Sequence, residues 1–380
     1  MTNALKVFVI AGEPSGDKLG AALMDGLKTL EPEVAFEGVG GPLMQGQGMS
    51  SLFPMDELSL MGIAEILPKY RHLKMRIRQT AEAVIAAKPD VLITIDSPDF
   101  CLRVARLVKA ASDIRIVHYV APTVWAWRPG RALKMAKVVD QVLALFPFEP
   151  PYMEAAGIDC DFVGHPVATL DRVSEGEIEA LDIERPSIVV LPGSRRSEIE
   201  RLSDTFVRAI EAAGLPHRVI IPTLPHLAER VRALFSSLDP ILIGHDVQPE
   251  EAARQRLIAM AHADVALAAS GTVSLELAAA RTPMVIAYDM NWLSRQIISR
   301  MLRTDTVTLV NLVSETRHVP EFIGAACKPE PIARALREVI ANPTQQLDAL
   351  TRTMARLGEG GEPPGLRAAR AVMGRLKRKI

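Results

Sequence analysis

The sequence predicts an α/β protein made of two Rossmann-like, doubly wound domains that face each other across a cleft. Short, nearly continuous apolar runs alternate with longer helical patterns, which is typical of parallel strands covered by helices on both faces. Six such runs lie on each side of about residue 170, and 380 residues are too many for one core. The polar segment 167–186 is interpreted as a linker with a surface helix.

The N-terminal domain is expected to span residues 1–168 and the C-terminal domain residues 169–357. The six N-terminal strands are expected at 6–12, 36–41, 90–97, 115–122, 141–147 and 161–166. The six C-terminal strands are expected at 187–194, 217–224, 241–245, 264–271, 284–289 and 308–314. The Gly- and Pro-rich break 358–365 precedes a last helix, 366–380, which we expect to pack back on the N-terminal domain.

The bulk composition excludes several classes of protein. A net charge of −1 provides no overall field for nucleic acid, so no nucleic-acid partner is expected. Cys101, Cys160 and Cys327 lack metal or redox spacing, which fits a reducing cytoplasm. No apolar run reaches the roughly 18–20 residues that span a bilayer, and the N-terminal run is too short for a signal peptide.

The stretch LPGSRRSE, residues 191–198, predicts an anion site at the end of a strand. Gly193 permits a tight turn, and Ser197 with Glu200 has the spacing of a capping box, which predicts a helix start there. A helix N-terminus with Ser194 and Arg195 before it suits a phosphate, because backbone N–H groups and guanidinium both bind its oxygens. The alternative is a capped surface helix with solvated arginines.

The stretch AASGTVSLE, residues 268–276, predicts a second ligand-binding turn in the same domain. Ser270, Gly271 and Thr272 form a small-residue turn through which backbone amides can approach a ligand. Glu276 can accept both hydroxyls of a ribose, although it can also simply complement the helix dipole. Both turns follow strands of one sheet, so together they indicate a nucleoside diphosphate in the C-terminal domain.

The stretch IDSPDF, residues 95–100, supplies a candidate general base. Asp99 precedes a helical pattern and is interpreted as its N-cap. Asp96 ends a strand and has no such structural task, so it can take a proton from an acceptor hydroxyl. The alternative for Asp96 is a turn residue that bonds the backbone.

The stretch AGEPSGD, residues 11–17, is interpreted as a strand, a turn and a helix start. Ser15 is expected to cap the helix. Ser15, Gly16 and Asp17 are expected to face sugar hydroxyls or to shape the cleft, because an acidic first turn disfavours phosphate. The sequence 159–161 has the D-x-D spacing of some metal-dependent sugar transferases, but it precedes its strand. We therefore expect neither a metal nor another cofactor.

An apolar and then basic segment, residues 58–78, is predicted to contact a membrane surface or acyl chains. Five Lys or Arg and no acid lie between Lys69 and Arg78, and six lie in the last helix. Apolar residues followed by cations suit an anionic membrane interface, whereas the alternative is a core helix followed by a solvated one. The residues concerned are Leu60, Met61, Ile63, Ile66, Leu67, Lys69 and Arg71.

These motifs together resemble the lipid-A-disaccharide synthases, glycosyltransferase family 19. The matching stretches, which run from about residue 7 to 325, are AGEPSGDKLGA, MGIAEIL, IDSPDF, HYVAPTVWAWRPGR, FVGHP, LPGSRRSEIE and ASGTVSLE. The resemblance implies a GT-B fold and an inverting, UDP-sugar-dependent hexosyltransferase. It implies transfer of 2,3-diacylglucosamine from UDP-2,3-diacylglucosamine to 2,3-diacylglucosamine 1-phosphate (lipid X), which gives lipid A disaccharide 1-phosphate and UDP. The implied location is peripheral, at the cytoplasmic face of the inner membrane.

The resemblance also assigns roles to particular residues. It marks Asp96, Arg195, Glu276 and Asn311 as critical, although the family often has Pro where this chain has Val310. The stretch 118–131 adds three residues for which sugar or acyl contacts are expected and core packing is the alternative: Trp125, Trp127 and Arg128.

Other functions remain open from the sequence. A UDP-sugar 2-epimerase and the muramyl-pathway GlcNAc transferase are built on similar paired domains, but the apolar and basic segment argues against an enzyme of soluble sugars. A carrier of lipid or nucleotide without catalysis is the third possibility. Asp96 opposite a diphosphate loop argues against a carrier.

Overall fold

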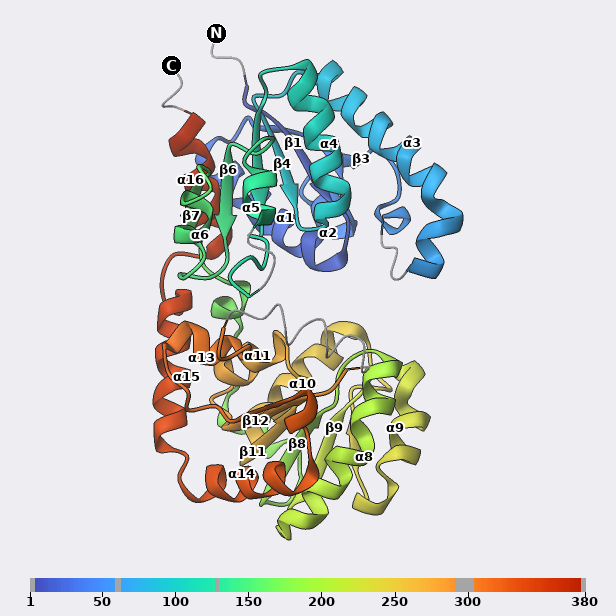
Figure 1. The fold of residues 1–380 in the computed structure, drawn as a ribbon, viewed down its shortest axis with the longest axis vertical. Helices are drawn as coiled ribbons and strands as arrows, with labels where there is room; N and C mark the ends of the chain where they lie inside the picture. The colour runs from blue at the N-terminus through green and yellow to red at the C-terminus, as the bar shows by residue number, and fades with distance from the viewer. Residues whose placement is uncertain (1–3, 59–62, 127–129, 291–303, 377–380) are drawn as a thin grey trace. The chain divides into compact units, whose positions relative to one another are not determined.

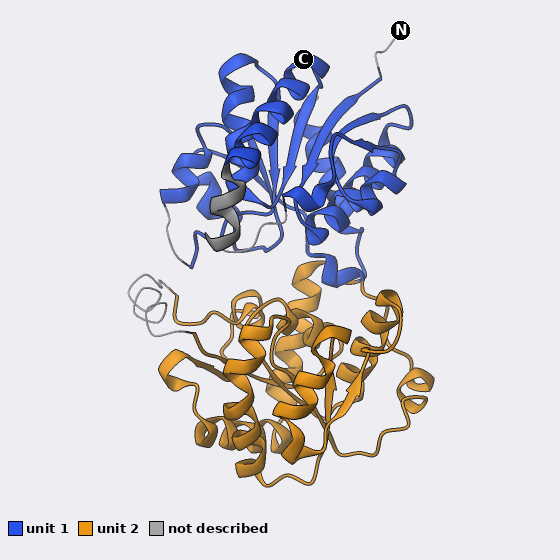
Figure 2. Ribbon diagram, turned by 90° about the vertical axis from the view of Figure 1, so that its right-hand side faces the viewer, with its two compact units in different colours: residues 1–169, 360–380 blue, residues 170–359 orange. Residues whose placement is uncertain are grey.

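The chain folds into two compact units, each with its own parallel sheet (Figures 1 and 2). The computed structural model describes residues 4–58, 63–126, 130–290 and 304–376, without the side chains of 63–70. Unit 1 contains Met1–Thr169 together with Gly360–Ile380, and unit 2 contains Leu170–Glu359. The expected domain boundary, at residue 168, stands beside an observed division after Thr169.

Unit 1 is built on a seven-stranded sheet with the order β3-β2-β1-β4-β5-β6-β7 and only parallel pairs. Its strands are β1 Lys6–Ala11, β2 Ala35–Val39, β3 Ser50–Ser51, β4 Val91–Ile95, β5 Arg115–Tyr119, β6 Gln141–Ala144 and β7 Asp159–Phe162. Strand β7 begins two residues earlier than expected, so Asp159 and Asp161 lie within it and not before it. The sequence predicted every strand of this sheet except β3. That strand is too short to produce a pattern, because two residues show no alternation.

Helices cover both faces of this sheet. They are α1 Pro14–Leu30, α2 Pro42–Gly46, α3 Ile63–Ala87, α4 Pro98–Ala111, α5 Gly130–Met135, α6 Pro150–Glu154 and α16 Pro364–Leu376. Successive side chains of β1 enter opposite cores, as a strand buried on both faces requires. Val7 and Val9 pack with α1 and α16, whereas Phe8 and Ile10 pack with α3 and α4.

Unit 2 is built on a six-stranded parallel sheet with the order β10-β9-β8-β11-β12-β13. Its strands are β8 Ser187–Leu191, β9 Arg218–Pro222, β10 Ile241–Ile243, β11 Val265–Ala268, β12 Met284–Tyr288 and β13 Glu321–Ile323. The predicted strand 308–314 is wrong, because Leu309–Ser314 forms helix α13. A short run that is apolar on nearly every side does not distinguish strand from helix.

The helices of unit 2 surround that sheet. They are α7 Glu175–Glu179, α8 Arg196–Ala213, α9 Ala228–Leu234, α10 Pro249–His262, α11 Val273–Ala279, α13 Leu309–Ser314, α14 Pro329–Ala341 and α15 Thr344–Leu357. The surface helix expected in 167–186 is α7, which has no buried residue and is capped by Ser174 and Glu177.

Both sheets reverse their strand order beside a central strand. In unit 1 the chain proceeds from β1 first to β2 on one side and later to β4 on the other, and in unit 2 β8 is flanked in the same way by β9 and β11. Ligands of such sheets bind at the carboxyl ends of the strands at this reversal. Among the described helices, none combines the length and apolar character that crossing a bilayer requires.

Candidate functional site

A cavity of about 590 Å³ opens in unit 2 at the carboxyl ends of β8 and β11. The two strands pair there, with Leu191 opposite Ala268. The volume is typical of small-molecule sites. The cavity joins both predicted ligand-binding turns and is lined by seven of the expected donor-binding residues: Gly193, Ser194, Arg195, Ser270, Gly271, Thr272 and Glu276.

The first turn is shaped by Gly193 and the start of α8. Gly193 has φ +112°, and a Cβ there would lie 2.6 Å from Oε2 of Glu198. Arg195 is the N-cap of α8, and its N–H donates to Glu198 Oε2 at 3.4 Å. The predicted capping box of Ser197 and Glu200 is therefore wrong, because the helix begins before Ser197.

The two arginines of this turn differ in their surroundings. Arg195 lines the cavity, and its Nη1 lies 3.6 Å from Oε1 of Glu198. Arg196 does not line the cavity, and its Nε donates to Oε1 of Glu200 at 3.0 Å. Glu198 also accepts from Tyr288 Oη at 3.3 Å. Burial of that phenol, with the Glu198 carboxylate beside it, raises the pKa of Tyr288. Of the two arginines, only Arg195 lines the cavity, and the carboxylate of Glu198 lies beside its guanidinium.

In the same cavity, Glu276 of α11 forms an ion pair with Arg256 of α10. Both residues line the cavity. The sequence analysis did not identify Arg256, because nothing in the local pattern of α10 separates it from the other charged residues of that helix. Only the packing of α10 against α11 brings it to the site.

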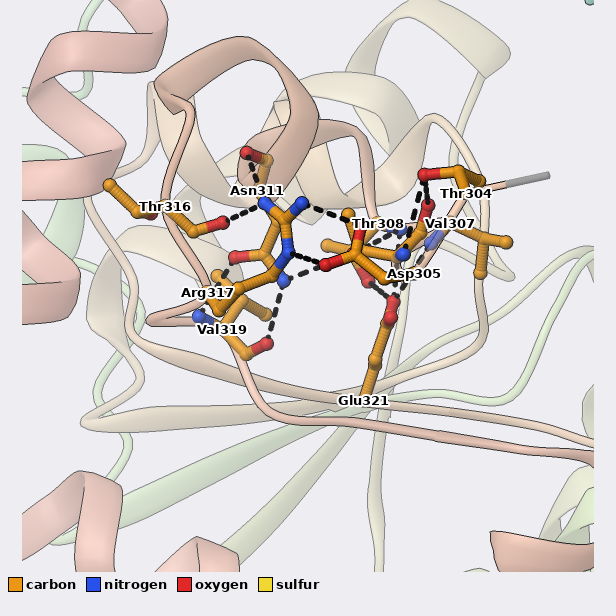
Figure 3. Close-up of polar contacts among 10 residues, drawn as sticks. Thr304, Asp305, Val307, Thr308, Asn311, Thr316, Arg317, Val319 and Glu321 are labelled. Atoms are coloured by element: carbon orange, nitrogen blue, oxygen red, sulfur yellow. Dashed lines mark hydrogen bonds and ion pairs between the residues drawn. The ribbon is translucent and has the colours of Figure 1, made fainter. Parts of the chain in front are cut away.

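Asn311, for which a contact with the donor is expected, is not among the described residues that line this cavity. Its side chain is 1% exposed and makes hydrogen bonds at both ends (Figure 3). Nδ2 donates to the carbonyl oxygen of Val319 at 2.9 Å and to Thr306 Oγ1 at 3.3 Å, and Oδ1 accepts from the N–H of Val319 at 3.0 Å. The amide therefore supports the loop after α13 in this structure.

In unit 1, Asp96 and Ser97 connect β4 to α4 through strained backbone. Their φ angles are +49° and +41°, in the left-handed region that non-glycine residues rarely occupy. The N–H of Asp96 donates to the carbonyl oxygen of Tyr119 at 3.0 Å. Among the described residues its half-buried carboxylate makes no hydrogen bond or ion pair. Ser97, and not Asp99 as predicted, is the N-cap of α4.

The expected acceptor residues of the first turn of α1 have structural positions. Glu13, and not Ser15, is the N-cap, and Ser15 is exposed. Asp17 is 2% exposed and accepts from three main-chain N–H groups at the start of α2, those of Gly41, Leu43 and Met44, at 2.8–3.1 Å. Asp17 therefore holds the start of α2, and its expected contact with sugar hydroxyls stays a prediction. Gly16 is buried against β1 and β4.

Trp125 belongs to an aromatic cluster, while Trp127 and Arg128 lie outside the described residues. The Trp125 ring meets Phe148 edge to face, with centroids 5.3 Å apart. Glu149, beside this cluster, is buried, and its Oε2 accepts from the N–H groups of Leu145 and Phe146. Burial raises the pKa of Glu149 to about 8. Trp125 thus shows the packing that was the alternative to a ligand contact.

The apolar and basic segment is described only in part. Leu60 and Met61 lie outside the described residues, and so do the side chains of Ile63, Ile66, Leu67 and Lys69. Arg71 is exposed, whereas Arg76 binds Glu57 through both Nε and Nη2 at 2.7 Å. Residues 69–78 contain no acid, but Glu57 supplies the carboxylate that pairs with Arg76.

The cations of α16 that the structure describes are also paired within unit 1. Arg375 binds both carboxylates of the D-x-D stretch, Asp159 and Asp161, at 2.7 Å. Arg370 binds Glu362, and Arg367 donates to the carbonyl oxygen of Phe162. These three cations have partners within unit 1, and the other three Lys or Arg residues of the last helix, in 377–379, lie outside the described residues. The pairs with Arg375 occupy the D-x-D carboxylates.

Comparison with known proteins identifies the family. A family model described as lipid-A-disaccharide synthetase matches residues 7–361. The lipid-A-disaccharide synthase of Ruegeria pomeroyi is 60% identical, covering 98% of this chain and 96% of the relative. That of Rhodospirillum centenum is 44% identical, covering 99% and 96%.

Solved structures show the fold alone. A Staphylococcus aureus MnaA structure with UDP superposes with a TM-score of 0.64 at 13% identity, covering 99% of this chain and 98% of that one. MurG of Acinetobacter baumannii superposes with a TM-score of 0.59 at 14% identity, covering 99% of each chain. The epimerase and muramyl-pathway alternatives thus share only architecture with this chain, and the chain belongs to the lipid-A-disaccharide synthase family, GT-B glycosyltransferases of lipid A biosynthesis.

Proposed function

We propose that the chain transfers 2,3-diacylglucosamine from UDP-2,3-diacylglucosamine to the 6-hydroxyl of lipid X, 2,3-diacylglucosamine 1-phosphate. The products are a β-1′,6-linked disaccharide 1-phosphate and UDP. Family membership supports the glycosyl transfer. The observation that carries the donor assignment is the cavity of about 590 Å³ in unit 2, whose lining includes both an arginine at a helix start and a carboxylate.

The cavity suits each part of a nucleoside diphosphate. Arg195 and the N-terminal N–H groups of α8 bind the diphosphate, which gains negative charge as the glycosidic bond breaks. Electrostatic stabilisation of this kind is worth about 3–4 kcal/mol per group removed. Glu276 accepts the ribose hydroxyls. The turn at Ser270–Thr272 also lines the cavity and supplies main-chain amides.

Asp96 is the proposed general base. Its carboxylate takes the proton of the acceptor 6-hydroxyl, and the oxygen attacks the anomeric carbon from the face opposite UDP. The α-linkage of the donor thereby becomes a β-linkage. The strained backbone at Asp96 supports this role, because strain at a strand end commonly marks a functional residue.

The reaction is proposed to need no metal. Arg195 and the start of α8 supply the positive charge, and the D-x-D carboxylates already bind Arg375. EDTA should therefore leave turnover unchanged, and a strict Mg²⁺ requirement would refute this part of the proposal.

Peripheral attachment to the cytoplasmic face of the inner membrane is proposed from residues 58–78. The composition of this segment supports the proposal, with acyl contacts expected from 61–67. The purified chain should sediment with anionic vesicles in low salt and be released in high salt. An absence of binding at low salt would contradict it.

The decisive experiment is a transfer assay with radiolabelled UDP-2,3-diacylglucosamine, with and without lipid X. Thin-layer chromatography should show a labelled disaccharide phosphate only when lipid X is present. A labelled product that forms without acceptor would indicate epimerisation or hydrolysis. Retention of intact donor in both arms would indicate a carrier.

A further inference from the structure

The ion pair between Arg256 and Glu276 joins two helices across one wall of the nucleotide cavity. Arg256 comes from α10 and Glu276 from α11, and both side chains line the cavity. The contact uses Nη2 of Arg256 and Oε2 of Glu276. Among the described residues, Oε1 of Glu276 has no hydrogen-bond partner. One carboxylate oxygen is thus fixed and the other is free to accept a ligand hydroxyl.

The charges of the cavity explain why a carboxylate there needs a cation. The ionisable side chains that line it are two arginines and two glutamates, and each arginine is paired with one glutamate, Arg195 with Glu198 and Arg256 with Glu276. A diphosphate that enters this cavity is repelled by an unpaired carboxylate. The guanidinium of Arg256 offsets the negative charge of Glu276 and so reduces this repulsion. The second carboxylate oxygen of Glu276 can still accept a hydrogen bond from the ligand.

Arg254, two residues before Arg256 on α10, has different partners and lies on a different side of the helix. Arg254 donates to both oxygens of Glu177 at 2.7 Å, and to the carbonyl oxygens of Asp171 and Arg172. Residues two positions apart on a helix point to different sides. Arg254 therefore fastens α10 to the segment around α7, while Arg256 points to the cavity.

We infer that Arg256 is a positioning residue that orients the Glu276 carboxylate toward the ribose, and that this pair makes the site prefer a ribonucleoside diphosphate over its 2′-deoxy counterpart. The inference rests on the proposed function, because it requires Glu276 to bind the ribose. Arg256 itself need not touch the ligand.

The test measures the dissociation constants of UDP and 2′-deoxy-UDP by calorimetry for wild type, Glu276→Gln and Arg256→Met. Hydrogen bonds to a charged group favour the ribonucleotide by roughly 10- to 100-fold in wild type. Both variants should lower this ratio to about threefold or less, mainly by weakening UDP. Arg256→Lys should restore part of the ratio, because it keeps the charge but not the planar fork.

The control is Arg208→Met, which removes an exposed ion pair with Asp204 on α8 outside the cavity. Arg208→Met should leave the ratio of the two dissociation constants unchanged. A variant that only lowers stability, without changing Glu276, should also leave this ratio unchanged. Thermal unfolding of each variant shows that it is folded when binding is measured.

The outcomes separate this inference from the proposed function. If Glu276→Gln keeps the ratio, the ribose contact is wrong and the inference falls with it. If Glu276→Gln loses the ratio while Arg256→Met keeps it, only the inference is overturned. Equal weakening of both nucleotides by Arg256→Met would make Arg256 a direct phosphate ligand and would also overturn the positioning role.

Discussion

Asp96 combines strained backbone with a carboxylate that has no hydrogen-bond or ion-pair partner among the described residues. Removal of this carboxylate should affect catalysis without affecting donor binding. Asp96→Asn should lower kcat by roughly 10²- to 10⁴-fold, the range for loss of a general base. The affinity for UDP should stay unchanged, because the described residues that line the nucleotide cavity all belong to unit 2. Steady-state kinetics and calorimetry measure the two effects. Turnover close to wild type would contradict the assignment.

Arg195 and Arg196 form a matched pair for testing the diphosphate site. Arg195→Ala should weaken UDP binding and lower kcat/KM by roughly 10²- to 10³-fold, because the leaving diphosphate loses its cation. Arg196→Ala removes the same charge one residue later, where the side chain pairs with Glu200 outside the cavity. It should change kcat/KM by less than about threefold. Similar losses in both variants would indicate a general charge effect.

Glu149 gives unit 1 a pH dependence whose sign follows from its burial. Its pKa is raised from 4.5 to about 8, so the folded state keeps a proton that the unfolded chain has lost. Its stabilising contribution is fully present below pH 4.5 and is lost as the pH rises toward 8. Glu149→Gln keeps an oxygen for the N–H groups of Leu145 and Phe146 and does not titrate.

Glu149→Gln should therefore flatten the fall in unfolding free energy between pH 5 and pH 8.5 by roughly a few kcal/mol. Urea unfolding at both pH values measures it. Glu154→Gln, which removes an exposed carboxylate nearby, is the control and should keep the wild-type slope. A wild-type slope in Glu149→Gln would show that this carboxyl is ionised in the folded state.

At the level of single residues, position after a strand was informative and residue type was not sufficient. Arg195 and Glu276 were predicted because parallel strands bring their following loops to one edge. The main-chain partners of Asp17 and Asn311 could not be predicted, because a polar side chain looks the same in sequence whether its partner is a ligand or the main chain. Their burial, 2% and 1%, follows from contacts with segments that the local sequence does not reveal.

At the level of elements, strand positions were largely predicted and helix starts were less so. The apolar run of each long strand has an unambiguous length and flanking turn. Helix α8 begins before the predicted cap, since Glu198 bonds the N–H of Arg195 and replaces the capping pair of Ser197 and Glu200. The sequence of helix α13 resembles that of a strand, because burial on several sides removes the helical period.

The packing of α16 on α1 depends on two glycines that let the helix backbones approach closely. A Cβ on Gly26 would lie 2.7 Å from the carbonyl oxygen of Gly365, and a Cβ on Gly365 would contact the carbonyl of Ala22. Main-chain atoms cannot rotate away as a side chain can. Gly365→Ala should therefore destabilise unit 1 by about 1–3 kcal/mol.

Gly374 is the matched control for this prediction. It lies in the same helix, but a Cβ there would have no heavy atom within 4 Å. Gly374→Ala should be neutral or stabilise the helix by up to about 1 kcal/mol. Urea unfolding, together with limited proteolysis of α16, compares the two variants. If Gly365→Ala were as stable as Gly374→Ala, the close approach of α16 to α1 at Gly365 would not contribute to the stability of unit 1.

At the level of the whole molecule, the two-domain α/β architecture was predictable because its signal is distributed along the chain. The prediction rests on twelve apolar runs and a polar break between them, so one misassigned strand does not change the predicted architecture. Unit 1 is formed by two segments that lie far apart in the sequence, and this was harder to predict. Gly360–Ile380 belongs to it, and Ala368, Ala369 and Val372 of α16 fill one of its cores. Such a return is decided by packing between distant segments.

This discontinuity predicts that unit 2, and not unit 1, can be excised as a simple fragment. Residues 170–359 have their own core, and their ends are joined, because Glu359 binds both Arg172 at 3.2 Å and Arg281 at 2.6 Å. The fragment also contains every residue that lines the nucleotide cavity. It should fold and bind UDP within about threefold of the full chain, a difference below about 0.7 kcal/mol.

The same fragment should have no transferase activity, because it lacks Asp96. Calorimetry with UDP and the radiolabelled transfer assay test the two statements together, and Arg195→Ala within the fragment should weaken UDP as it does in the full chain. A fragment 1–359, which removes α16, should instead lose stability in unit 1, since the apolar surface of α1 is then uncovered. A folded fragment 170–359 that fails to bind UDP would mean that unit 1 supplies part of the nucleotide site, and the donor assignment to this cavity alone would be wrong.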